Sequence, residues 1–496
     1  MAAQTQASNV LSTEHLKTNL KGRTVRGGAV TVGAQACLFL ISSVSTMVMA
    51  RILTPADFGL VAMVTTLVAV AQGFADLGLS EATIQRREIS MDQISTLFWI
   101  NVGAGAALTV LTAALAPLFV WFYREPRLRD ITLASSLTFL ICSLRVQHDA
   151  LLKRQMRFFS LAVRDVTSFV VGVPAGIVMA LRGAGYWAIV AIPLITNLTQ
   201  VLLSWLMVRW IPGPPRRGAG VRSMVAFGGN VAVSYLTYNM MRSADNVLVG
   251  WYWGPAPLGL YSKAYSLLML PVRQLSAPLG NVLVPAFSRL QDDPDRFARY
   301  YLRAANLITW FGTPIFGFLF VAAEPVIVIL LGSRWKAAVP VFELLAISAF
   351  AQLLLGLTVW LLVSGGRSKR LVKLYLMISP VIVGSYAVGL PFGIKGVALS
   401  SSLVLVSIFP WMMKFTFRET ALNLLGLGRA IACPISICLC GVFCAELTLR
   451  LMAPARTISQ LLVIASTFVA VYALAALVRP VRQEIVSLRQ LFGSAA

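Results

Sequence analysis

Residues 235–248, YLTYNMMRSADNVL, place charged and polar side chains inside an otherwise apolar segment. On a helix, side chains that recur every three or four residues form one stripe. The stripe consists of Tyr235, Tyr238, Asn239, Arg242, Asp245 and Asn246. A charge at the centre of a membrane helix costs about 2.5 to 3.5 kcal/mol on insertion scales. We therefore expect the stripe to face protein or water, and we predict that it lines a binding cavity. The alternative is that Arg242 and Asp245 only pair with each other and join this helix to a neighbour.

The next apolar segment, residues 258–290, carries Lys263 and Arg273 within its predicted span, 258–286, and has no acidic residue between its ends. Its prolines recur every seven residues, which is about two helical turns, so their gaps in the backbone hydrogen bonding fall on one side. These prolines are Pro271, Pro278 and Pro285, and the carbonyl groups that lose their donors are those of Leu267, Gln274 and Asn281. Unbonded carbonyls deep in a membrane belong beside a cavity. A kinked helix that serves packing alone is the alternative.

The composition predicts an integral membrane protein. Of the 496 residues, 58% are hydrophobic and only 12% are charged, whereas soluble domains are about 25% charged. Apolar runs of about twenty residues fit bilayer-spanning helices, which satisfy their own backbone hydrogen bonds. We therefore predict an all-α fold. The net charge of +23 is spread over many short hydrophilic breaks and not over one face, so nucleic-acid binding is not expected.

The apolar runs predict about fourteen membrane-spanning helices. They lie at about 27–50, 57–80, 94–122, 128–147, 160–181, 185–208, 222–250, 258–286, 300–323, 338–364, 371–391, 394–415, 427–449 and 457–478. Lys and Arg gather in alternate breaks, and positively charged loops stay in the cytoplasm. We therefore predict cytoplasmic N- and C-termini. The polar first 26 residues lack the apolar stretch of a signal peptide.

A tandem repeat is predicted from segments about 200 residues apart. RILTPADFGL at 51–60 matches WYWGPAPLGL at 251–260, and GGAVTVG at 27–33 matches GGNVAVS at 228–234. The Pro/Gly/Arg-rich loop RWIPGPPRRGAGV at 209–221 would join the two copies. Because each copy has six spans, both enter the membrane from the same side and are related by an axis along the membrane normal.

The predicted organisation follows from this repeat. It consists of an N-terminal tail at 1–26, an N-lobe at 27–208, a linker at 209–221, a C-lobe at 222–418, two further helices within 419–478, and a C-terminal tail at 479–496. The lobes would rock against each other around a central cleft. Two histidines, His15 and His148, and six cysteines form no metal-ligand or disulfide pattern. Neither a cofactor nor a metal site is expected.

Several motifs resemble those of the Wzx and WzxC-like polysaccharide exporters. They are RILTPADFGLVAM, the following DLGLSEATIQRRE, LGLYSKAYSLLMLP and VLVPAFSRLQDD. These oligosaccharide flippases share a superfamily, and the MATE-like fold, with lipid II flippases and with drug and toxin extrusion antiporters. The resemblance implies a bacterial inner-membrane protein that moves an undecaprenyl-diphosphate-linked repeat unit to the periplasmic leaflet, for capsule, exopolysaccharide or O-antigen (lipopolysaccharide) assembly. Polysaccharide polymerase and chain-length machinery are the implied protein partners.

The predicted site suits such a head group. Guanidinium groups bind phosphate oxygens through paired hydrogen bonds, and these strengthen in a low-dielectric cleft. We predict that Arg242, Lys263 and Arg273 bind the diphosphate. The uncharged members of the stripe, Tyr235, Tyr238, Asn239 and Asn246, suit sugar hydroxyls. Each methylene of the lipid tail drawn from hydrocarbon would lose about 0.8 kcal/mol, so the tail stays in lipid and the cleft needs a lateral slit.

Two driving forces fit these charges. The membrane potential, negative inside, would favour outward movement of an anionic head group by about 2.3 kcal/mol per charge per 100 mV. The alternative is proton or sodium antiport through an acidic residue in the membrane. Asp245 is the leading candidate for such ion coupling, followed by Asp76 and Glu343 near the ends of their spans.

Other classes of function fit less well. The sequence shows no carboxylate pair beside a histidine, no nucleophile elbow and no phosphate-binding loop, so we predict that the protein is not an enzyme such as a membrane polysaccharide polymerase. A drug or toxin antiporter would need carboxylates where this chain carries Arg242, Lys263 and Arg273. A peptidoglycan-precursor flippase shares the same charge requirement and stays open as an alternative.

Overall fold

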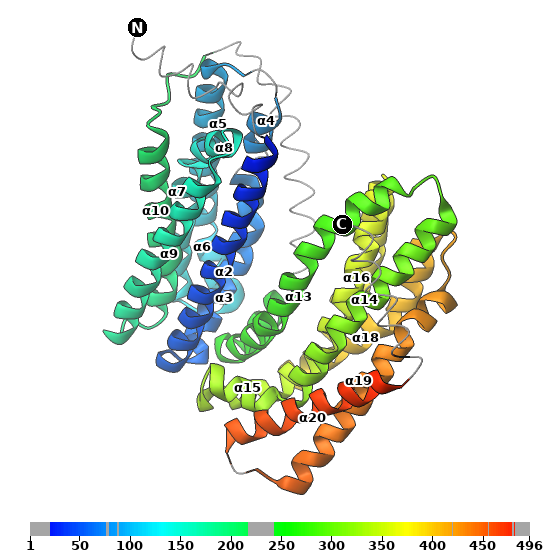
Figure 1. Ribbon diagram of the computed structural model, residues 1–496. Coiled ribbons are helices and arrows are strands. Elements are labelled where there is room, and N and C mark those ends of the chain that lie inside the picture. The colour runs from blue at the N-terminus through cyan, green and yellow to red at the C-terminus, as the bar shows by residue number, and fades with distance from the viewer. Residues whose placement is uncertain are drawn as a thin grey trace. The chain divides into compact units, whose positions relative to one another are not determined.

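The computed structural model describes residues 20–75, 79–86, 89–216, 243–418, 420–454, 456–478 and 481. They belong to two compact units, Met1–Gly259 and Leu260–Ala496 (Figure 1). Regular structure in these ranges is helical throughout, which confirms the predicted all-α fold. The predicted lobe and linker boundaries stay a prediction.

The first unit is built from helices that follow the apolar runs of the sequence. They are α2 (Leu20–Ile52), α3 (Pro55–Ala75), α4 (Leu79–Gln85), α5 (Met91–Ala114), α6 (Ala116–Tyr123), α7 (Leu128–Ser143), α8 (Val146–Arg154), α9 (Phe158–Leu181), α10 (Tyr186–Val208) and α12 (Ala244–Trp253). In this unit α9 packs against α10 and α2, and α5 packs against α7 (Figure 1). Ser90 starts α5 with a capping box, because its side chain accepts from the Gln93 N–H while the Gln93 side chain accepts from the Ser90 N–H.

The second unit contains the longest helix and seven more. They are α13 (Pro255–Arg289), which starts in the first unit, α14 (Pro294–Val321), α15 (Ala323–Leu330), α16 (Val339–Ser364), α17 (Ser368–Gly389), α18 (Gly393–Phe417), α19 (Leu424–Met452) and α20 (Thr457–Leu477). Here α14 packs against α16 and α19, α17 against α18, and α19 against α20 (Figure 1). Side-chain caps from Asp293 and Asn423 begin α14 and α19.

The described residues hold fewer candidate membrane spans than the fourteen predicted for the whole chain. Nine helical stretches of the described residues are long and apolar enough to cross a membrane, or ten if the bent α13 counts as one span. One of the nine, Lys369–Phe417, holds both α17 and α18, and α7, with 16 residues, is short for a bilayer that needs about 20. The seventh predicted span, 222–250, lies mostly outside the described residues. The predicted total of fourteen is therefore not confirmed.

A buried ionic network joins α8, α9 and α10 in the first unit. Asp149 accepts hydrogen bonds from Arg164 and from Arg145, the latter at 2.7 Å. The Ser204 hydroxyl donates to the same carboxylate at 2.9 Å, and Arg164 also pairs with Asp165 at 2.7 Å. Two guanidinium groups and two carboxylates thus neutralise one another where little water reaches, since Arg164 is only 6% exposed.

An aromatic cluster fixes the start of the connection that follows α10. His148 stacks on Trp205 at 4.6 Å between ring centroids, and its Nε2 lies 3.1 Å from the Trp210 carbonyl oxygen. Farther along, the Trp99 indole donates to the Gly213 carbonyl at 2.8 Å, while the Gly213 N–H donates to Ser95 Oγ at 3.1 Å. The first part of the predicted linker is therefore held against the first unit.

We expect replacement of Asp149 with Asn to destabilise the protein strongly. The change leaves Arg145 and Arg164 buried with too little negative charge, and breaking a buried pair costs about 3–5 kcal/mol. The apparent melting temperature in detergent measures the loss. Glu324→Gln is the control, because the Glu324–Lys336 pair has side chains 55% and 61% exposed and such a pair contributes about 0–1 kcal/mol. Equal melting temperatures for the two variants would contradict the role given to the network.

The burial of His148 predicts that the folded protein loses stability in mild acid. It lies in α8, outside the candidate membrane spans, and burial lowers its pKa from 6.5 to about 4. Between these values the unfolded chain binds a proton that the folded chain does not, so the His148 contribution is complete above pH 6.5 and is lost as the pH falls toward 4. Melting temperatures measured across this window should fall less in His148→Gln than in the unaltered chain. Parallel curves would show that His148 does not titrate as described.

Candidate functional site

Two members of the predicted polar stripe lie in the described part of the chain. Asp245, in the first turn of α12, is 3% exposed, and its Oδ1 accepts the Asn246 N–H at 2.7 Å. A carboxylate in this position is stabilised by the positive end of the helix dipole. Asn246 is half-buried, and its Oδ1 finds no hydrogen-bond partner in the described residues. The remaining predicted members of the stripe lie outside the described residues; they are Tyr235, Tyr238, Asn239 and Arg242.

The two predicted cations of the next segment both lie on α13. Lys263 is half-buried and Arg273 is exposed. These residues belong to the second unit, whereas Asp245 and Asn246 belong to the first. A shared binding surface for the four side chains therefore stays a prediction, as does the role of Asp245 in ion coupling.

The other acidic candidates do not form a metal site. Glu343 lies half-buried near the start of α16, and Asp76 lies outside the described residues. Within the described ranges, no group of three or more His, Cys, Asp or Glu side chains is placed to hold a metal ion.

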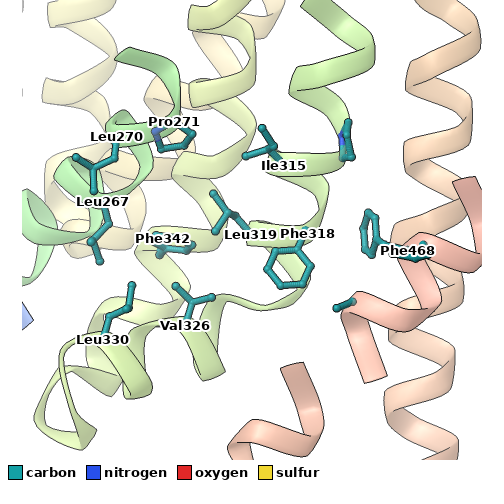
Figure 2. A pocket seen from close by; sticks show the side chains of 13 residues that line it. Leu267, Leu270, Pro271, Ile315, Phe318, Leu319, Val326, Leu330, Phe342 and Phe468 are labelled. Atoms are coloured by element: carbon teal, nitrogen blue, oxygen red, sulfur yellow. The ribbon is translucent and has the colours of Figure 1, made fainter. Parts of the chain in front are cut away.

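An apolar cavity of about 510 Å³ lies within the second unit (Figure 2). Four of its five walls are the consecutive helices α13 to α16, and the fifth is α20, more than 90 residues farther along the chain. The lining residues are Leu267, Leu270 and Pro271 of α13, Pro314, Ile315, Phe318 and Leu319 of α14, Val326 and Leu330 of α15, Phe342 of α16, and Ala465, Phe468 and Val469 of α20. Every one of these side chains is apolar, so the cavity offers no hydrogen bond to water.

Prolines from two helices contribute to the wall of this cavity. Pro271 interrupts α13 and Pro314 interrupts α14. A proline inside a helix lacks the N–H that would bond to the carbonyl four residues earlier and its ring displaces that carbonyl. The 41° bend of α13 lies farther along, between Pro255–Ser276 and Pro278–Arg289, at Pro278. Of the three prolines singled out in the sequence of α13, Pro271 lines the apolar space.

The cavity lies next to a cation on the same helix face. Lys263, Leu267 and Pro271 are spaced by four residues along α13, so their side chains lie one above the other. Figure 2 shows Leu267 and Leu270 directed into the space that Phe318 and Leu319 enter from α14. An amphiphile could place its anionic head beside Lys263 and its apolar chain against the cavity wall.

Sequence reasoning named Lys263, Leu267 and Pro271 but missed the rest of the cavity. Phe318, Phe342 and Phe468 belong to helices that are all rich in apolar residues, and nothing in their local pattern separates a cavity wall from a lipid-facing surface. The one local signal was the proline inside each of α13 and α14.

Comparison with solved structures identifies the fold. The fold is similar to that of the lipid II flippase MurJ in an inward closed conformation, with a TM-score of 0.71 and 12% identity, over 90% of this chain and 99% of that chain. It is also similar to an inward-facing MATE-family multidrug resistance transporter of the MOP superfamily, with a TM-score of 0.59 and 14% identity, over 77% and 96% of the two chains. The helices thus form the MurJ- and MATE-like fold of multi-pass membrane transporters.

Comparison of sequences identifies the family. A family model described as "Polysaccharide biosynthesis protein" matches residues 48–340. Similar proteins include the lipopolysaccharide biosynthesis protein WzxC of Escherichia coli K12, 25% identical over 66% of this chain and 67% of that protein. Another is the teichuronic acid biosynthesis protein TuaB of Bacillus subtilis 168, 26% identical over 67% and 69%. The succinoglycan biosynthesis transport protein ExoT of Rhizobium meliloti 1021 is 25% identical over 62% and 63%.

The chain belongs to this polysaccharide biosynthesis protein family. Its candidate spans mark it as a multi-pass membrane protein of this family. The predicted resemblance to Wzx-type exporters is confirmed.

Proposed function

We propose that the protein is a flippase that moves an undecaprenyl-diphosphate-linked oligosaccharide from the cytoplasmic to the periplasmic leaflet of the bacterial inner membrane by alternating access. The observation that carries this proposal is the apolar cavity of about 510 Å³ with Lys263 one turn from its wall. Membership in a polysaccharide biosynthesis family supports a glycan as the transported group.

The two ends of such a substrate have opposite requirements. Each methylene removed from an apolar environment costs about 0.8 kcal/mol, so the polyprenyl tail must keep apolar contacts while the head crosses. The cavity walls on α13, α14 and α20 offer those contacts for a part of the tail. The diphosphate needs cations in a place where water is scarce, and Lys263 and Arg273 supply positive charge along α13.

The negative charge of the diphosphate also suggests how transport is driven. A diphosphate head moving outward across a potential that is negative inside gains about 2.3 kcal/mol per charge per 100 mV. The orientation rests on the basic residues of alternate loops, which favour cytoplasmic termini. Polymerase and chain-length machinery acting on the released product are the proposed protein partners.

Narrowing the cavity should slow flipping of a long-chain substrate. Leu319 lines the cavity, so Leu319→Trp fills space that the tail would occupy. Loss of two methylene contacts, at about 0.8 kcal/mol each, predicts a rate about tenfold lower in proteoliposomes. Leu376→Trp is the matched control, because Leu376 lies on α17 with 59% of its surface exposed. A short-chain analogue should be flipped at the same rate by both variants. If Leu319→Trp flips the long-chain lipid normally, the tail does not use this cavity.

Flux should respond to the membrane potential alone. In proteoliposomes with a clamped potential and no proton or sodium gradient, we expect outward flux of the diphosphate-linked lipid to rise steeply with the potential. Lys263→Met should reduce that flux, and Lys263→Arg should retain most of it, because the proposed role is charge next to the cavity.

The alternative driving force for transport is proton or sodium antiport through Asp245. It predicts no flux without an ion gradient, and it predicts that Asp245→Asn abolishes flux when a gradient is present. Either result would remove the potential as the driving force while leaving the substrate assignment intact. Equal flux of a cationic drug in the same vesicles would instead point to the antiporter class.

A further inference from the structure

One end of the α17–α18 helix pair concentrates positive charge. Between Glu343 and Glu419 the sequence has no acidic residue, yet it holds seven Lys and Arg. Six of the seven lie where α17 begins or α18 ends, and they are Arg367, Lys369, Arg370, Lys373, Lys414 and Arg418. The other basic corner of this unit differs, because the sequence between α13 and α14 carries Asp292 and Asp293, followed by Asp295.

Arg370 fastens the start of α17 to the end of α18. Its guanidinium group donates to the carbonyl oxygen of Arg418 at 2.8 Å and to that of Phe415. The same group lies 5.1 Å from the centroid of the Phe415 ring, and the Arg418 guanidinium lies 5.8 Å from that centroid. Both distances allow a cation–π interaction. The cations of the two helices therefore lie together at one end of the pair.

The exposed cations at this end have no carboxylate partner. Four of the six are exposed, namely Lys369, Lys373, Lys414 and Arg418. None of the four makes an ion pair within the described ranges. Helix α17 packs mainly against α18 and α16, and the single acidic residue of α16, Glu343, lies near the start of α16, whereas α17 follows its end. Like charges gathered in this way repel one another, so a bound anion would stabilise this end of the unit.

An exposed apolar surface continues from the cations along both helices. Leu376 of α17 is 59% exposed and Leu403 of α18 is 58% exposed. Trp411, one turn before the cations of α18, is 44% exposed. The stretch Lys369–Phe417 is apolar enough to lie in a membrane, so the cations stand at the boundary of that stretch. Tryptophan and basic side chains are typical of the interface between lipid and water.

We propose that this end of the α17–α18 pair binds an anionic phospholipid of the surrounding bilayer. The phosphate lies among Lys369, Lys373, Lys414 and Arg418, and the acyl chains lie on the apolar surface beside them. A phospholipid matches both parts of this surface, because each Lys or Arg near an anionic lipid surface is favourable and the chains stay in hydrocarbon. The inference goes beyond the proposed function, since this lipid is a resident partner of the second unit and is not carried.

Fluorescence of Trp411 tests the site in vesicles. The full-length chain is placed in phosphatidylcholine vesicles that contain phosphatidylglycerol with the same acyl chains, and one of the two lipids carries brominated chains that quench tryptophan. The difference between each protein and its Trp411→Phe form isolates the signal of Trp411. We expect phosphatidylglycerol to be preferred at Trp411 at least fivefold, which corresponds to the about 1 kcal/mol gained for each Lys or Arg near an anionic surface. Raising the salt to 1 M should remove most of this preference.

Two charge-matched variants show which cations hold the lipid. The site variant replaces the four exposed cations with glutamine, as Lys369→Gln, Lys373→Gln, Lys414→Gln and Arg418→Gln. The control variant removes the same number of exposed charges at other helix ends, as Arg129→Gln, Arg182→Gln, Arg334→Gln and Arg456→Gln. We expect the site variant to bind the two lipids equally well and the control variant to keep the preference. Double variants of α17 alone or α18 alone should each keep a part of it, and melting temperatures in detergent check that all variants fold.

Four outcomes would overturn the proposal. One is the absence of any preference for phosphatidylglycerol in the unaltered chain. A second is an equal loss of preference in the site and control variants, which would show that the lipid responds only to total charge. A preference that survives 1 M salt would contradict binding of the phosphate by cations. Displacement of phosphatidylglycerol from Trp411 by polyprenyl diphosphate at about one-hundredth of its concentration would assign the surface to the carried lipid.

Discussion

A charge buried away from water has nothing to solvate it, and this constraint accounts for most of what is particular to the chain. In the first unit the constraint is met by neutralisation, where Arg145 at the start of α8 and Arg164 of α9 share Asp149. In the second unit, Lys263 stands one turn from a cavity whose walls carry no polar group. A cation beside an apolar space is suited to a substrate with one charged and one apolar end.

Much of the fold could be predicted from the sequence because hydrocarbon demands long apolar helices. The expected span at 160–181 is α9, Phe158–Leu181, and the expected span at 185–208 is α10, Tyr186–Val208. Part of the sequence match that predicts a repeat has a physical reason as well. Gly59 and Gly259 meet carbonyl oxygens so closely that only glycine fits, so the same residue stands at both positions of the repeat.

The candidate site was less predictable because its parts are brought together by tertiary packing. Phe318 and Phe468 are 150 residues apart in sequence yet line one cavity, and apolar residues on membrane helices look alike whether they face lipid or a cavity. Arg164 and Asp149 lie on different helices, so spacing along the chain did not reveal their ion pair. The predicted number of spans is not confirmed for a related reason, since hydropathy finds apolar runs but does not show which of them cross the membrane.

The central claim is that this chain carries a lipid-linked glycan across the membrane. Extraction of polyprenyl-diphosphate-linked oligosaccharide from cells that lack the protein tests it most directly, provided that the glycan's exposure to a periplasmic glycosidase is measured before lysis. The account predicts that the complete repeat unit accumulates and is protected from the enzyme, and that expression of the chain makes it accessible. Accumulated units that the enzyme already cleaves in the absence of the protein would contradict the account.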